Sequence, residues 1–187
     1  PQLPVPTRAG YNFVPWVSPV KFTEDLTLNA EWEGITYYIQ YDANGGTGTL
    51  PRQAVTVGLG STVFSSHGDM DKVGYDFTSW NTNADGSGKS YAELSEITDL
   101  LTPEDGAPVT LYAQWNPVQC DASLLGGDEP GYATFTFDSA TVTDFTPATR
   151  TGYTCTGYYV SPSSETCVLS TAGVLQPDTD YTDAEGR

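Results

Sequence analysis

Two stretches of this sequence carry residue types whose spacing could support chemistry. The first is Ser65-Ser66-His67-Gly68-Asp69, which brings a hydroxyl, an imidazole and a carboxylate close together in the chain. Catalytic triads are assembled in space by a scaffold that also supplies a nucleophile elbow or an oxyanion hole, and this stretch has neither signature. His67 is the only histidine. We therefore predict that the protein is not an enzyme.

The second stretch places side-chain oxygens at alternating positions before a glycine. Asn81, Asn83 and Asp85 precede Gly86, a spacing that calcium loops also use. A calcium loop would end on a glutamate at its twelfth position, where this chain has Ala92. Hairpin turns are rich in the same residues. Asn81, Asn83 and Asp85 are thus weak calcium candidates, and a turn is the preferred interpretation.

The cysteines allow several pairings. Cys155 and Cys167 flank a predicted hairpin over residues 158–166 and could form a disulfide, which would leave Cys120 free or intermolecular. Cys120 could instead pair with Cys155 or with Cys167, or all three thiols could be reduced and buried. Because no Cys-x-x-Cys spacing occurs, the cysteines predict no metal site.

Charge and composition exclude other classes of function. The chain has 24 Asp and Glu against 7 Lys and Arg, a net charge of −17, which disfavours nucleic acid and anionic lipid as partners. No apolar run approaches the roughly 20 residues that span a bilayer. Gly45-Gly46-Thr47-Gly48 lacks the lysine of a phosphate-binding loop, so we expect no cofactor. The abundance of Thr, Tyr, Gly and Asp fits an exported, β-rich protein.

The elements that would position these residues recur along the chain. A Gly-Tyr pair opens three similar stretches, at Gly10-Tyr11, Gly74-Tyr75 and Gly152-Tyr153, and each continues with the alternation of a strand. Two further stretches, 26–32 and 109–115, resemble each other and end in tryptophan. The aromatic positions of these stretches predict the core of the repeat: Tyr11, Phe13, Trp16, Trp32, Tyr75, Phe77, Trp80, Trp115, Tyr153 and Tyr158.

The repeat divides the chain into three modules. Residues 1–34 would be the C-terminal half of one module, 35–115 a complete module, and 116–187 a divergent module that stops before its closing strand. In the complete module, Thr36–Tyr41 is a strong strand prediction because it is β-branched and aromatic. Apolar residues at 94, 97, 100 and 101 have helical spacing and predict a short helix over 94–101.

Four spaced motifs of the complete module resemble the Listeria–Bacteroides repeat, the B-repeat of internalins. They are Tyr41-Asp42-Ala43-Asn44-Gly45-Gly46, the stretch 74–82, Ala84-Asp85-Gly86-Ser87-Gly88, and Thr110-Leu111-Tyr112-Ala113-Gln114-Trp115. Residues 8–32 match the latter half of the family pattern, and 118–175 match it loosely, with Cys155 in place of the aromatic and Tyr158 in place of the tryptophan. The resemblance implies a mainly β (α+β) fold of tandem β-grasp-like modules, each with a mixed sheet and one short helix.

The resemblance also implies a secreted or cell-surface setting and no catalysis. Our first hypothesis is a spacer, stalk or adhesive segment whose partners are the neighbouring modules. The second is a module that binds a glycan or a host protein through exposed aromatics. The third is a filament subunit that joins other copies of itself through the unpaired edges of incomplete terminal modules.

Overall fold

The protein, described here from a computed structural model, is built from strands. The structure describes residues 3–17, 27–137, 139, 142–159, 167–170 and 172–174, and these contain no helix. The chain forms two compact units: Pro1–Met70 with Thr78–Gln114, and Asp71–Phe77 with Trp115–Arg187. The strands are β1 (Tyr11–Phe13), β2 (Trp32–Gly34), β3 (Thr36–Asp42), β4 (Gln53–Thr56), β5 (Tyr75–Asn81), β6 (Ser90–Tyr91), β7 (Pro108–Pro117), β8 (Gln119–Leu124), β9 (Gly131–Thr136), β10 (Val142–Thr146), β11 (Tyr158–Tyr159) and β12 (Cys167–Leu169).

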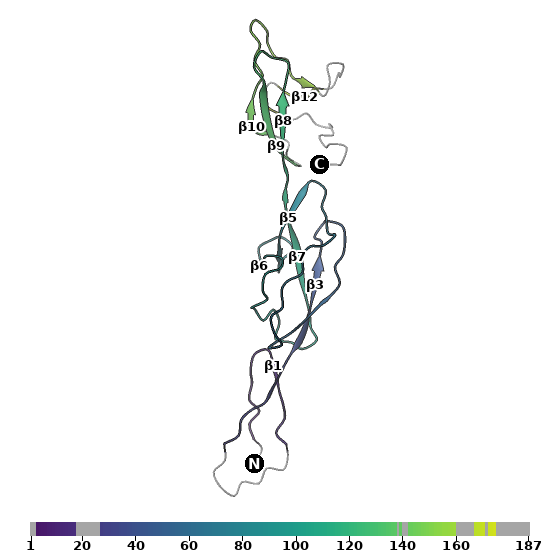
Figure 1. Cartoon of the computed structure of the whole chain (residues 1–187), viewed down its shortest axis with the longest axis vertical. Coiled ribbons are helices and arrows are strands. Elements are labelled where there is room, and N and C mark those ends of the chain that lie inside the picture. The colour runs from purple at the N-terminus through teal and green to yellow at the C-terminus, as the bar shows by residue number, and fades with distance from the viewer. Residues whose placement is uncertain are drawn as a thin grey trace. The chain divides into compact units, whose positions relative to one another are not determined.

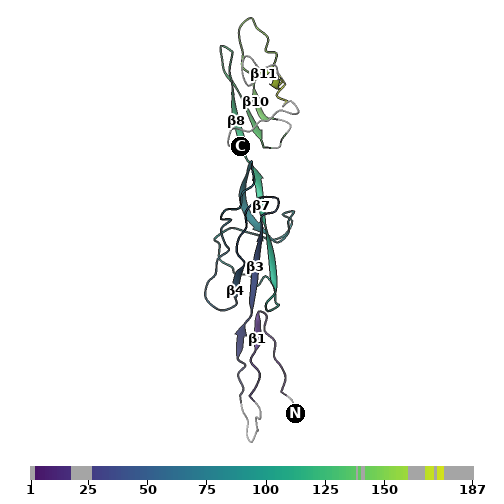
Figure 2. The ribbon, with the colours of Figure 1, turned by 90° about the vertical axis from the view of Figure 1, so that its right-hand side faces the viewer.

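The largest sheet is mixed and has five strands, in the order β4-β3-β7-β5-β6. β3 pairs in parallel with β7 and antiparallel with β4, which follows it in the chain (Figures 1 and 2). β5 pairs antiparallel with β6. β7 is the last of these five strands in sequence but lies at the centre of the sheet. The sheet is therefore complete only when β7 has been added. A mainly β fold with a mixed sheet is therefore confirmed.

Alternation along the strands builds the core of this sheet. Along β3 the side chains of Tyr37, Ile39 and Tyr41 are buried, while Gln40 is exposed. Trp80 from β5 and Leu111 from β7 are completely buried as well. Each such side chain contributes roughly 1.5–3 kcal/mol by its burial. The core of the five-stranded sheet thus comes from residues of the predicted complete module.

The predicted helix over residues 94–101 is wrong. Leu94 has a φ of 58°, which a right-handed helix cannot contain. The segment instead runs beside residues 62–64: Leu94 N donates to Phe64 O at 3.0 Å, and Ile97 N donates to Thr62 O at 2.8 Å. Pairing with a distant segment has overridden the local helical spacing of apolar residues. A β-grasp arrangement, which needs that helix, is not supported either.

Residues before β3 form a small antiparallel sheet of their own within the first unit. β1 pairs with β2, with Tyr11 opposite Gly34 and Phe13 opposite Trp32. The predicted closing strand of 26–32 is shorter than expected, since β2 begins only at Trp32 and residue 26 lies outside the described residues.

The second unit contains an antiparallel sheet in the order β10-β9-β8 and the short pair β11–β12. Its core is small, with Leu124, Ala133, Tyr158 and Leu169 buried together. The aromatic strand predicted from Tyr153 onward is confirmed only at β11, because residues 153–157 have no strand structure. The predicted hairpin partner is present as β12, although the loop over 160–166 lies outside the described residues.

Candidate functional site

The three Gly-Tyr pairs lie in three turns of the same geometry, which we call the Gly-Tyr turns. They comprise Arg8–Tyr11, Lys72–Tyr75 and Arg150–Tyr153, and in each the tyrosine N–H donates to the carbonyl of the basic residue, at 3.1, 2.9 and 3.1 Å. The glycines have φ values of 77°, 76° and 80°. Only glycine adopts this left-handed backbone readily, which explains why it recurs at this position.

A cation lies over the tyrosine ring in every Gly-Tyr turn. The distances from the ring centroid are 3.9 Å for the Arg8 guanidinium, 4.1 Å for the Lys72 ammonium and 4.3 Å for the Arg150 guanidinium. Such contacts contribute about 0.5–1 kcal/mol at exposed sites. Our sequence reasoning missed these basic residues, although a signal was present: three of only seven Lys and Arg stand two positions before the repeated glycine.

The first Gly-Tyr turn is hydrogen-bonded to the residue that precedes the five-stranded sheet. Ile35 N donates to Gly10 O at 3.0 Å, and Val57 N donates to Ile35 O at 3.0 Å. Gly10 is buried, and a Cβ on it would lie 3.3 Å from the Leu100 side chain and 3.4 Å from that of Val57. The turn therefore joins the β1–β2 sheet to the residue that precedes β3.

The second Gly-Tyr turn repeats this arrangement within the second unit. Val118 N donates to Gly74 O at 2.9 Å, and Phe137 N donates to Val118 O at 2.9 Å. The rings of Tyr75 and Phe137 meet edge to face, with centroids 5.5 Å apart. Gly74 is buried, and a Cβ on it would overlap the Phe137 ring. Val118 thus corresponds to Ile35, and Phe137 corresponds to Val57.

Aromatic pairs next to the first two turns are also equivalent. Phe13 meets Trp32 edge to face at 5.7 Å, and Phe77 meets Trp115 in the same manner at 5.7 Å. In the third copy the corresponding position is Cys155, which is exposed. The repeat therefore keeps one phenylalanine–tryptophan pair per turn in two copies and lacks its phenylalanine in the third.

The other predicted core aromatics have different environments. Trp16 contacts Phe13 edge to face at 5.0 Å. Tyr158 is buried and its hydroxyl accepts from Ala148 N at 2.8 Å. Tyr153, which we predicted as a core residue, is 69% exposed and belongs to no described core. Residues 153–157 do not form the expected strand.

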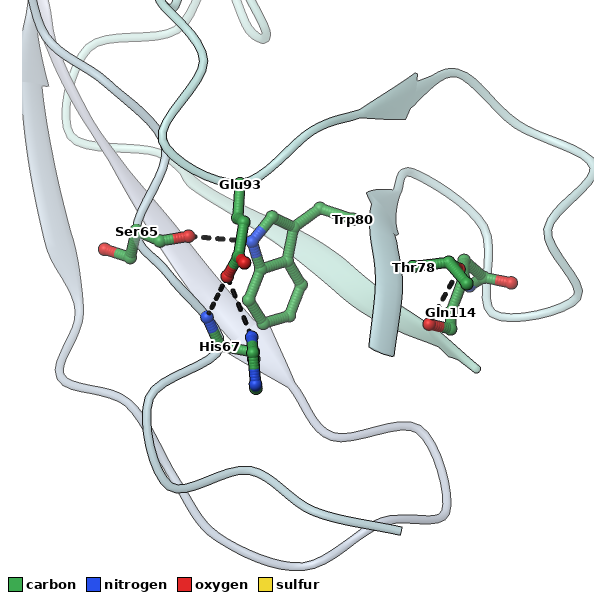
Figure 3. A network of polar contacts seen from close by, with 6 residues as sticks. All are labelled: Ser65, His67, Thr78, Trp80, Glu93 and Gln114. Carbon is green, nitrogen blue, oxygen red and sulfur yellow. Dashed lines mark hydrogen bonds and ion pairs between the residues drawn. The ribbon is translucent and has the colours of Figure 1, made fainter. Parts of the chain in front are cut away.

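The stretch around His67 is tied to the sheet by structural hydrogen bonds (Figure 3). Trp80 Nε1 donates to Ser65 O at 2.9 Å, and the Ser65 hydroxyl donates to Gln53 Oε1 at 3.2 Å. The Glu93 carboxylate accepts from the His67 backbone N–H at 2.9 Å and lies 2.8 Å from its Nδ1. These hydrogen bonds hold the pKa of Glu93 below its usual value. The arrangement anchors a loop over Trp80.

The same view shows how β5 and β7 are joined beside this loop, where the Thr78 hydroxyl donates to Gln114 O at 3.0 Å (Figure 3).

Side-chain oxygen atoms of Asn81 and Asp85, two of the three weak calcium candidates, already accept hydrogen bonds from the protein. Asn81 is fully buried, and its Oδ1 accepts from Asn83 N at 2.8 Å and from Gly88 N at 3.1 Å. Asp85 Oδ1 accepts from the Ser87 hydroxyl and amide, which lowers the pKa of Asp85. Among the described residues, no group of three His, Cys, Asp or Glu could hold a metal ion. The contacts favour the turn interpretation.

Two cysteines have described side chains, and both are free thiols. Cys120 is half-buried, and Cys155 is exposed with its Sγ 3.7 Å from Gly157 O. The side chain of Cys167 lies outside the described residues. The structure therefore does not show the predicted disulfide between Cys155 and Cys167.

Residues 37–114 match the model of the Listeria-Bacteroides repeat domain family. Two relatives come from Evansella cellulosilytica. A "Putative Gly-rich membrane protein" is 29% identical over 174 residues, which cover 82% of this chain and 19% of that protein. A "Putative membrane protein" is 31% identical over 128 residues, covering 59% of this chain and 18% of its own length. The chain thus spans about a fifth of either relative. No solved structure matches it.

The part of the chain that the structure describes contains no helix of the length and apolarity that a membrane span requires.

Proposed function

We propose that this chain is a non-catalytic repeat segment of an extracellular surface protein, and that it acts as a spacer or stalk. The observation that carries the proposal is the repeated joint: in two Gly-Tyr turns, a glycine carbonyl accepts from the β-branched residue that precedes the next strand. A backbone hydrogen bond and a covered glycine at each joint restrict how consecutive modules can move. Restricted joints are what a spacer needs in order to hold its ends apart.

Several features support this proposal over catalysis. The polar groups around His67 and the Asn81 turn bond to the protein itself and stabilise loops. The net charge of −17 favours a solvated surface and disfavours self-association. The family match and the membrane-protein names of the relatives fit a surface setting.

Small-angle X-ray scattering of the chain at several concentrations, with and without reductant, tests the proposal. We expect an elongated particle whose profile does not change with concentration. A compact particle would contradict the spacer function. Growth with concentration would favour the filament hypothesis, and loss of that growth on reduction would assign it to a thiol such as that of Cys120.

Binding of a glycan or a host protein is a second candidate that the exposed tyrosines favour. Tyr132 is 48% exposed and Tyr153 is 69% exposed, whereas Trp80 is fully buried. An array of surface glycans and candidate proteins, probed with the parent chain and with a Tyr132→Ser, Tyr153→Ser double variant, tests it. Binding that the double variant loses would support this role, and equal signals from both chains would reject it.

A further inference from the structure

The third Gly-Tyr turn has the geometry of the first two but, in the part of the chain that the structure describes, lacks their cover. Gly10 and Gly74 are buried, whereas Gly152 is exposed. Among the described residues, nothing lies within 4 Å of a Cβ placed on Gly152, although an apolar side chain meets each of the other two glycines. Tyr153 is 69% exposed, while Tyr11 and Tyr75 are half-buried.

The third turn is nevertheless held in a fixed conformation. Tyr153 N donates to Arg150 O at 3.1 Å, and Thr151 N donates to the Asp128 carboxylate at 2.8 Å. The Arg150 guanidinium lies over the Tyr153 ring, and Thr149 N donates to Glu129 O at 3.2 Å. A surface that is ordered before it is covered loses little conformational entropy on binding.

From this comparison we propose that the Arg150–Tyr153 turn is a docking site for one kind of partner, a further module of the same repeat class. The partner would enter with a β-branched residue, as Ile35 and Val118 do, whose N–H donates to Gly152 O. An apolar side chain that follows its first hairpin, as Val57 and Phe137 do, would cover Gly152 and contact Tyr153. The inference rests on the proposed function, since it extends the same joint to a third position.

Among the described residues, neither Ile35 nor Val118 can enter the site without leaving its own joint. Ile35 already donates to Gly10 O, and Val118 already donates to Gly74 O. A second copy of the chain would carry both residues in the same engaged state. The partner is therefore an additional module, and tethering it to the chain would raise its effective concentration to the millimolar range with a short flexible linker.

The test uses the full chain lengthened by a flexible Gly-Ser linker and a second copy of residues 35–115. Amide hydrogen exchange is measured by NMR at the Ile35 position of the added copy. We expect Tyr153→Ser to speed this exchange at least about tenfold, since the amide is released when the docked module leaves. Tyr132→Ser, which removes an exposed tyrosine outside the turn, is the matched control and should change nothing.

A second extended chain, carrying a copy of residues 116–187 and monitored at Val118, guards against an added module that does not fold. Folding of each copy is read from protection of its own strand amides, at Ile39 or Ala133. Equal exchange rates in the parent and the Tyr153→Ser variant, in whichever copy is folded, would overturn the proposal. That result would leave the scattering profile of the unextended chain unchanged, so it would not by itself refute the spacer function.

Discussion

Replacing the turn glycines by alanine separates the backbone cost of a left-handed residue from the steric cost of filling a covered turn. All three glycines have φ between 76° and 80°, so alanine meets the same backbone cost of about 1–2 kcal/mol at each. The surroundings differ. At Gly152 no described atom meets the new methyl group, at Gly10 it meets the flexible Leu100 side chain at 3.3 Å, and at Gly74 it overlaps the Phe137 ring.

Gly74→Ala should therefore cost more than Gly152→Ala. Overpacking a filled site costs typically about 1–3 kcal/mol, so we expect a total of about 2–5 kcal/mol at Gly74 against about 1–2 kcal/mol at Gly152. The difference of about 1–3 kcal/mol corresponds to a roughly 5- to 150-fold larger opening constant of the second joint. Gly10→Ala should lie between the two, because Leu100 can rotate away.

Native-state hydrogen exchange at the Val118 amide measures that opening, because this N–H donates to Gly74 O. A double-mutant cycle with Phe137→Ala isolates the steric part: in that background, Gly74→Ala should cost no more than Gly152→Ala does in the parent. A cost of Gly74→Ala at Val118 no larger than the backbone cost of about 1–2 kcal/mol, or a cycle with no coupling, would refute the assignment of Phe137 as the cover of the turn.

Three further predictions concern the complete module. Asn44→Ala should lower the free energy of unfolding by roughly 1–3 kcal/mol in urea titrations, because Nδ2 donates to two backbone carbonyls and φ is 50°; Asn44→Gly should recover only the backbone part. Asn81→Ala should lower the free energy of unfolding at least as much as Asn44→Ala does for each hydrogen-bonding group left unsatisfied, since the Asn81 side chain is fully buried. Asn81→Asp should not restore the lost stability. Burial, and to a lesser extent the neighbouring Asp99 carboxylate, raises the pKa of Tyr91 to about 12. The unfolded state therefore loses this proton first, so Tyr91 stabilises the fold below pH about 10 and that contribution is lost as the pH rises to about 12. Alkaline unfolding of Tyr91→Phe should lack this part of the pH dependence, and an unchanged profile would contradict the assignment.

Residue patterns alone predicted the strands that have strong local signals. The β-branched and aromatic run from Thr36 became β3, and the stretch 109–115 lies within β7. Period-two alternation dictates both, because each strand buries one set of side chains against the core.

The failures have a common physical origin in long-range pairing. Residues 94–101 have helical spacing, but their partners at 62–64 could not be known from the local sequence. The same holds for the joints: Gly10 and Ile35 are hydrogen-bonded although they precede β1 and follow β2, so they are far apart in the sequence. The exposure of Tyr153 was also unpredictable, since a tyrosine at a repeat position is covered only where a neighbour supplies the cover.

The strand order β4-β3-β7-β5-β6 determines when the central module can fold as the chain is made or exported. β3 and β5 both lie next to β7, and the β3–β7 ladder runs from Pro108 to Tyr112, so β3 cannot complete this ladder until Tyr112 has emerged. Parallel pairing of β3 with β7 also requires the intervening segment to cross over before any hydrogen bond forms, which makes folding slow. We expect the central module to reach its native state late and in one step, and its unpaired strands to depend on the chain's negative charge to avoid aggregation in the meantime.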